Sequence, residues 1–144
     1  MRIDDFGWWN IPAALEIEQQ LFETQPWTEA HFWSELAADH RIFLAALEAD
    51  ELIGYADLSV NTPDAEIQTI AVRPDAQNRG IGTQLLTAMV AAALQHACTR
   101  ILLEVRADNA KAISLYERHG FVTNGRRPDY YALGLDAVLM ERHV

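Results

Sequence analysis

The sequence predicts a single mixed α/β domain, in which an antiparallel meander precedes a β-α-β-α-β unit with helices on both faces of the sheet. Three observations support this prediction. Residues 42–72 hold three apolar runs separated by turns, residues 81–96 show a helical apolar pattern directly after two glycines, and residues 101–105 form a short apolar run between helical segments. The length of 144 residues suits one domain, which we expect to span residues 1–144.

Two helices are expected before the meander. Asn10 can cap a helix that begins near Ile11, because its side chain can accept a bond from the first-turn amides. Thr28 can cap a shorter second helix, whose apolar face carries Phe32 and Leu36.

The meander follows from alternating apolar runs and turn residues. Residues 42–47 and 52–60 should form a hairpin around the polar turn at 48–51. Residues 61–64 (Asn-Thr-Pro-Asp) are typical of a second turn, after which residues 65–72 should form the third strand.

The second half of the chain alternates helices and strands. Apolar residues recur at helical spacing from Leu85 to Leu94, so a helix should end near His96. The run 101–105 is expected to be a central strand buried on both faces, with Glu104 as its one carboxylate.

A last helix and two strands complete the prediction. Asn109 can cap a helix that stops near Gly120. A strand should start at residue 121 and turn at residues 124–125 (Asn-Gly), and residues 137–140 should supply the final strand.

Composition and charge exclude several classes of protein. Half of the residues are hydrophobic and 22% are charged, which argues against disorder. The formal net charge of −10 argues against direct nucleic-acid binding and favours basic partners. The longest nearly uncharged stretch, residues 81–97, is short for a membrane span and no leader precedes it, so a cytoplasmic protein without membrane contact is expected. The five histidines are scattered, so we expect no metal site.

The glycines at positions 80 and 82 stand where a helix is about to begin, although glycine is a poor helix former. A helix N-terminus offers unpaired amides and a partial positive charge, so glycines there let an anion approach the backbone. A Walker loop would need a lysine after the second glycine, and a dinucleotide loop would need a small residue at Leu85. An anion site is therefore favoured over both nucleotide motifs, and a tight turn without a ligand remains the alternative.

Residues 77–83, which follow the strand 68–72, resemble the Gln/Arg-x-x-Gly-x-Gly/Ala pyrophosphate loop of the GCN5-related N-acetyltransferases. This resemblance implies a GCN5-related acyl-coenzyme A N-acyltransferase fold and acetyl-coenzyme A as co-substrate. The cofactor-binding residues that it implies, for the pantetheine arm, the diphosphate and the helix cap in turn, are Ile70, Ala71, Val72, Gln77, Asn78, Arg79, Gly80, Ile81, Gly82, Thr83 and Asn109.

Further segments resemble the ribosomal-protein-alanine acetyltransferase branch of that family: residues 18–27, 66–74, 103–106, 109–117, 120–121 and 126–131, with residues 136–137 and 140. The resemblance implies direct acetyl transfer, in a ternary complex, to the N-terminal amine of a protein. The favoured acceptor is the N-terminal alanine of a basic small-subunit ribosomal protein.

Glu104 is the first catalytic candidate. A lone carboxylate in an apolar strand can serve as a proton acceptor, although an ion pair with Arg100 or Arg106 is the structural alternative. The resemblance implies that Glu104 is the base that deprotonates the acceptor amine, through water. Glu66, on the preceding strand, is the runner-up for this role.

The resemblance further implies that Tyr116 is the acid that protonates the leaving thiolate, whereas helical spacing alone favours packing. It also implies that Trp27, Tyr130 and Tyr131 hold the acceptor peptide. Trp8 and Trp9 match no motif.

Three alternative functions remain open. The same fold could acetylate lysine side chains or small amines. A non-catalytic module could instead bind acetyl-coenzyme A as a sensor. A nucleotide-binding domain is the least favoured alternative.

Overall fold

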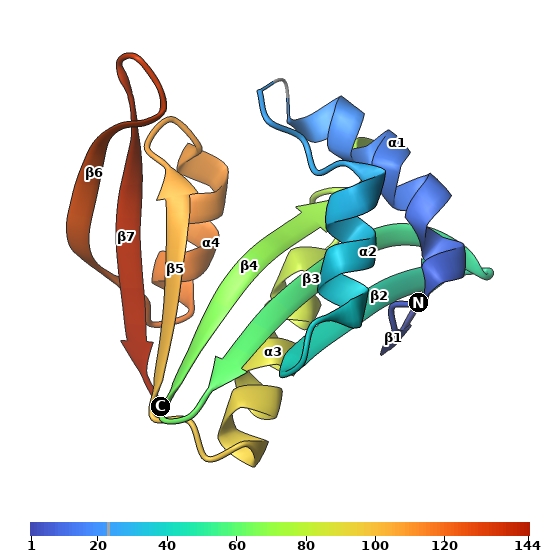
Figure 1. Cartoon of the computed structure of the whole chain (residues 1–144), viewed down its shortest axis with the longest axis horizontal. Coiled ribbons are helices and arrows are strands. Elements are labelled where there is room, and N and C mark those ends of the chain that lie inside the picture. The colour runs from blue at the N-terminus through green and yellow to red at the C-terminus, as the bar shows by residue number, and fades with distance from the viewer. Residues whose placement is uncertain (23) are drawn as a thin grey trace.

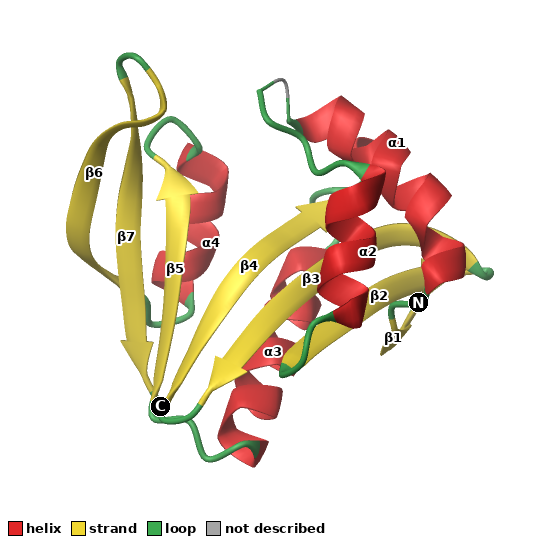
Figure 2. Cartoon of the chain, in the orientation of Figure 1, coloured by secondary structure: helices red, strands yellow, loops and turns green. Residues whose placement is uncertain are grey.

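The computed structural model describes residues 1–22 and 24–144, which form a seven-stranded mixed sheet with helices on both faces (Figures 1 and 2). Glu23, in the segment expected to separate the first two helices, lies outside the described residues. The strand order is β1-β2-β3-β4-β5-β7-β6, so the predicted fold class is confirmed. The strands are β1 (Arg2–Asp5), β2 (Arg41–Glu48), β3 (Glu51–Asn61), β4 (Asp64–Val72), β5 (Arg100–Arg106), β6 (Val122–Ala132) and β7 (Leu135–His143).

Two layers of helices enclose the sheet. The helices are α1 (Ile11–Leu21), α2 (Glu29–Ala37), α3 (Ile81–Gln95) and α4 (Ala110–Arg118), with 3-10 turns at Trp8–Asn10 and Pro74–Ala76. α1 and α2 pack on one face, over an aromatic core that includes Phe32 and Tyr55. α3 and α4 cover the other face, where Leu85, Leu86 and Met89 are completely buried. Figure 2 shows α1 and α2 in front of the strands and α3 behind them.

The sheet opens between β4 and β5. These neighbours are parallel and pair only from Asp64–Ile67 to Arg100–Leu103. Beyond these pairs the two strands diverge, as Figure 1 shows above the C-terminus. Because the strands diverge, the C-terminal end of β4 forms no backbone ladder with the C-terminal end of β5. The space between these two ends is open to side chains and to ligands.

Local capping agrees with the sequence at two positions and differs at a third. The Thr28 hydroxyl accepts the His31 amide at 3.1 Å, and the Asn109 side chain accepts the Ala112 amide at 3.1 Å. Asn10 occupies the N-cap position of α1, but its Oδ1 accepts the amide of Gly7 at 2.9 Å instead of a first-turn amide. The predicted Asn10 cap is therefore wrong in its bonding, because the preceding 3-10 turn takes the side chain.

Two further expectations are corrected, and one strand was missed. The Asn-Gly pair at residues 124–125 does not end a strand; it is a register shift inside β6, and the hairpin closes near Gly134 instead. β5 is buried on one face only, since residues alternate between buried and half-buried along it. β1 was not expected, because its mostly exposed residues carry no apolar alternation.

No helix in the described ranges is long and apolar enough to span a membrane. The described residues also contain no group of three or more His, Cys, Asp or Glu side chains arranged to hold a metal ion.

Asp57 is a fully buried carboxylate on β3, beneath α2. It faces Glu35, which Arg41 pairs with at 3.2 Å. Burial, together with the Glu35 carboxylate and against the smaller effect of Arg41, raises the pKa of Asp57 to about 8 from its ordinary value of 3.8. The folded protein thus binds this proton more tightly than the unfolded chain, so the free energy of unfolding should fall as the pH rises through this window.

Asp57→Asn should therefore stabilise the protein at high pH, because asparagine cannot ionise and its amide can donate to Glu35. At pH 8.5 the melting temperature should rise by about 3 °C or more, since about 1 kcal/mol shifts it by roughly 2–4 °C at this size. Near pH 4 the difference should vanish. The exposed Asp39→Asn makes the same charge change outside the core and is the matched control; an Asp57→Asn curve parallel to the wild type would refute the assignment.

Candidate active site

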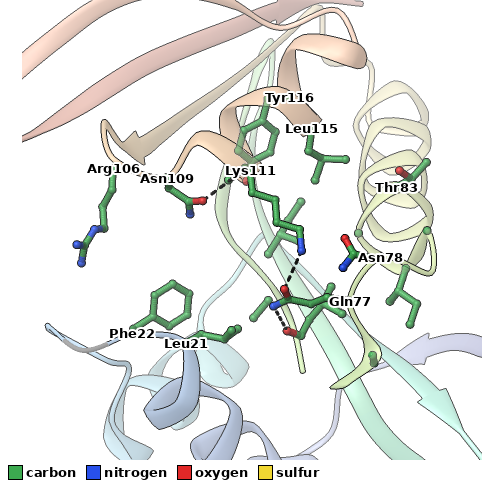
Figure 3. A pocket seen from close by; sticks show the side chains of 18 of the residues that line it. Leu21, Phe22, Gln77, Asn78, Thr83, Arg106, Asn109, Lys111, Leu115 and Tyr116 are labelled. Carbon is green, nitrogen blue, oxygen red and sulfur yellow. Dashed lines mark hydrogen bonds between the residues drawn. The ribbon is translucent and has the colours of Figure 1, made fainter. Parts of the chain in front are cut away.

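A cavity of ≈ 520 Å³ lies at the end of β4 (Figure 3). Its walls come from the end of β4, the loop into α3, the start of α4 and the end of α1. Most of the expected cofactor residues line this cavity: Ile70, Ala71, Val72, Gln77, Asn78, Gly80, Ile81, Gly82, Thr83 and Asn109. Arg79 does not, because its guanidinium pairs with Glu48 instead.

The loop into α3 presents its backbone to the cavity. Gly80 is the N-cap of α3, has a φ of +80° and makes no side-chain cap bond, and Asn78 also has a positive φ of 63°. The first-turn amides of a 15-residue helix therefore open towards the cavity with their partial positive charge. Gln77 holds the loop in place, since its Nε2 donates to the Val72 carbonyl at 3.1 Å and its Oε1 accepts from Lys111 at 2.8 Å (Figure 3).

The cavity suits a long anionic ligand such as acetyl-coenzyme A. A Cβ atom at Gly82 would lie 3.4 Å from Leu115 Cδ2 and 3.9 Å from Val72 Cγ2, two residues that line the cavity, so a side chain there would fill the space beside the loop. Arg106, Lys111 and Arg118 line the same cavity, although the whole chain has only 11 Lys and Arg and a net charge of −10. Asp108 also lines this cavity and pairs with Arg106, so the net positive charge of the lining comes from Lys111 and Arg118, and it favours phosphates there.

A second cavity, of ≈ 180 Å³, adjoins the first between the loop after α1 and β5. Glu104 lines it, and so do the expected acceptor residues Trp27 and Tyr131. Tyr116, Ile70 and Phe22 are among the residues that line both cavities, so two ligands can meet beside them.

Glu104 pairs with Arg127 at 3.2 Å, not with Arg100 or Arg106 as the structural alternative supposed. Arg100 pairs with Asp64, and Arg106 pairs with Asp108. The side chain of Glu104 is 23% exposed, which leaves it reachable from the cavity.

Tyr130 contacts Glu104 from β6, although it does not line the second cavity. The negative charge of Glu104 and a hydrogen bond to it raise the pKa of the Tyr130 hydroxyl. The Tyr130 ring also lies 5.6 Å below the Arg127 guanidinium. Glu104 therefore keeps fixed partners on the β6–β7 hairpin.

Glu66 lies close to Glu104 but is not part of either cavity lining. Burial and the charge of Glu104 raise its pKa, while Arg127 and Arg41 oppose the shift. The geometry thus favours Glu104 over Glu66 as the group that meets an acceptor.

Tyr116 projects from α4, which begins at Ala110 directly after its N-cap residue, Asn109. Its ring packs edge-on against Phe121 at 5.7 Å and is buried. Burial, with a smaller effect of Tyr131, raises the pKa of the Tyr116 hydroxyl, so the hydroxyl stays protonated at neutral pH and can donate.

Trp8 and Trp9 lie outside both cavities; their rings contact each other and are 61% and 64% exposed. Reasoning from sequence missed Glu18, Phe22, Arg106 and Lys111, all of which line a cavity. Glu18 carried one signal: it lies one turn after Ala14 on the apolar face of α1.

The larger cavity, with a helix N-terminus open towards it, and the smaller cavity beside it suit an enzyme that brings an anionic ligand and a second ligand together. Comparison with known proteins gives the same class. The acetyltransferase (GNAT) family model matches residues 11–121, and the chain belongs to this family. It is an N-acetyltransferase, and the acetyl-coenzyme A expected from the sequence is the acetyl donor of the family.

Several individual relatives are similar over most of the chain. The N-alpha-acetyltransferase RimI of Mycobacterium tuberculosis is 41% identical over 92% of this chain and 86% of the relative. The crystal structure of the Escherichia coli ribosomal-protein-S18-alanine N-acetyltransferase has a TM-score of 0.91 and 31% identity, covering 99% of this chain and 93% of that one. An uncharacterised protein of Mycobacterium leprae is also 41% identical, but this chain spans only 38% of its length.

Proposed function

We propose that this enzyme transfers the acetyl group of acetyl-coenzyme A to the N-terminal amine of a protein, with the N-terminal alanine of a ribosomal protein as the favoured acceptor. The observation that carries the proposal is the second cavity: its lining includes Glu104, and Tyr116 lines both this cavity and the larger one. The names of relatives that cover most of this chain, which specify N-alpha or ribosomal-protein-alanine acetyltransferases, support it. We assign residues 1–144 to one catalytic domain, working in the cytoplasm on a basic ribosomal protein.

In this proposal, the chain's own residues divide the chemistry between them. Acetyl-coenzyme A supplies an activated thioester. The α3 amides, Lys111 and Arg118 hold its phosphates, and the end of β4 aligns the arm that carries the thioester. Glu104 receives the proton of the amine, directly or through one water, and Tyr116 donates to the sulfur of the leaving thiolate.

An N-terminal amine suits this arrangement better than a lysine side chain. Its unperturbed pKa is about 8, against about 10.4 for lysine, so removing its proton at neutral pH costs less free energy and a carboxylate base suffices more readily. A lysine acceptor is the second candidate.

Tyr116→Phe should lower kcat by about 10- to 100-fold, because a hydrogen bond to a charged group contributes about 1.5–3 kcal/mol. The phenylalanine keeps the packing against Phe121, so the melting temperature should change little. The loss should shrink with a thioester whose thiol is a better leaving group. An equal loss with both donors would remove Tyr116 from the role of acid.

The proposal is tested by mass spectrometry on the protein, acetyl-coenzyme A and two peptides. One peptide begins with a free alanine and lacks lysine; the other has a blocked N-terminus and carries lysine. One acetyl group on the alanine amine alone is the expected result. Acetylated lysine would move the enzyme to the side-chain class, and transfer to neither peptide would reject a peptide acceptor.

A further inference from the structure

Glu18 projects from α1, and its carboxylate is buried against β3 and the loop that includes residues 24–28, with 1% of the residue exposed. Its Oε1 accepts the backbone amide of Trp27 at 2.7 Å, and its Oε2 accepts the hydroxyl of Tyr55, which is itself completely buried. The catalytic proposal gives Glu18 no role.

Both partners of Glu18 donate a hydrogen, so the carboxylate acts through acceptor oxygens. Burial raises the pKa of Glu18, while the bonds from Tyr55 and Trp27 oppose this shift. No ion pair involves Glu18 within the described ranges, 1–22 and 24–144. A buried carboxylate without a cation is costly to keep, which makes a purely stabilising role a poor explanation.

What Glu18 holds is the wall of the second cavity. Four described residues of the loop line this cavity: Phe22, Thr24, Gln25 and Trp27. Gln25 has a φ of 54°, which is unfavourable for a residue with a side chain, so this conformation needs support from its neighbours. Glu18 supports it by fixing the backbone at Trp27.

A second hydrogen bond holds the loop, and it comes from β5, on the other side of the opening in the sheet. Arg106, at the end of β5, donates to the Thr24 hydroxyl at 2.9 Å. The Trp27 ring is in addition stacked on His31 at 4.0 Å. Of these contacts, the bond to Glu18 is the one made to the loop backbone.

We propose that Glu18 is a positioning residue for the acceptor: by holding the Trp27 amide and the Tyr55 hydroxyl, it sets the shape of the wall against which the acceptor lies. This inference rests on the proposed function, in which the second cavity receives the acceptor. Glu18 itself does not take part in proton transfer.

The kinetic test separates shape from charge. Glu18→Gln keeps an acceptor for the Trp27 amide and offers a donor to the Tyr55 hydroxyl. The KM of the alanine peptide and the KM of acetyl-coenzyme A should therefore both stay within about threefold of the wild type. Glu18→Ala leaves both donors buried without a partner, and should raise the KM of the alanine peptide by about tenfold or more, with the KM of acetyl-coenzyme A nearly unchanged. Equal impairment by glutamine and alanine, or an unchanged peptide KM in Glu18→Ala, would overturn the proposal.

Hydrogen exchange tests the anchor without any acceptor. In Glu18→Ala, amide exchange in a fragment covering residues 24–28 should quicken by about tenfold, while fragments from β3 and α3 keep their rates. Tyr55→Phe removes one of the two bonds and should give a smaller change of the same kind, which decides the matter if Glu18→Ala does not fold. Unchanged exchange in the loop would reject the anchor.

The two tests can fail separately. If the wild type acetylates neither peptide but loop exchange responds to Glu18, the proposed function fails and the anchor stands. If the wild type acetylates the alanine peptide but loop exchange does not respond, the function stands and the anchor is rejected.

Discussion

Glu104→Gln is expected to lower kcat by about 10²–10⁴, which is the usual contribution of a general base. Glutamine has nearly the same size and can still bond to Tyr130, but it cannot accept the proton of the amine. The KM of acetyl-coenzyme A should stay within about twofold, because Glu104 lines the second cavity and not the larger one. Steady-state rates with the alanine peptide measure both quantities.

Glu66→Gln is the matched control for this experiment. Glu66 is the neighbouring carboxylate, so its replacement removes the same charge from the same region without touching the proposed base. We expect it to lower kcat by less than about tenfold. A larger loss in Glu66→Gln than in Glu104→Gln would transfer the role of base to Glu66.

Gly82→Asp should raise the dissociation constant of acetyl-coenzyme A by about 100-fold or more at low salt. The new side chain would occupy the space beside Val72 and Leu115, and its charge would repel the phosphates. The fold should not suffer, because an aspartate in the first turn of a helix interacts favourably with the helix dipole. Calorimetric titration with acetyl-coenzyme A and a melting curve measure the two effects.

Gly82→Asn is nearly the same size as Gly82→Asp and carries no charge. The loss of affinity in Gly82→Asn therefore measures the steric effect of the added side chain. The further loss in Gly82→Asp, relative to Gly82→Asn, measures the effect of the charge. Added salt should narrow this difference, since screening weakens the repulsion. Unaltered affinity in both variants would mean that the diphosphate does not lie against the first turn of α3.

Features that depend on neighbouring residues could be predicted from the sequence. The Thr28 and Asn109 caps, the meander and the glycine loop before α3 follow from short patterns, and the structure confirms them. The loop was informative because glycine at a helix start conflicts with helix propensity unless the backbone is needed there.

Features that depend on distant residues could not be predicted in the same way. Glu18 meets Tyr55 across 37 residues, and only the folded sheet brings them together. The pairing of Glu104 with Arg127 depends on the register of β5, β7 and β6, which turn residues did not give correctly at positions 124–125. The roles of Glu104 and Tyr116 came from a family resemblance and stay predictions until the variants are measured.

The divergence of β4 and β5 has an evolutionary consequence. Because the opening is made by the backbones of two strands, its existence does not depend on the side chains that line it. In the proposed function, the donor side is built from the end of β4 and the start of α3, whereas the acceptor side draws on the loop after α1 and the β6–β7 hairpin. Mutations in these two peripheral segments are therefore expected to change the preferred acceptor in small steps without altering the residues proposed to hold the acetyl donor.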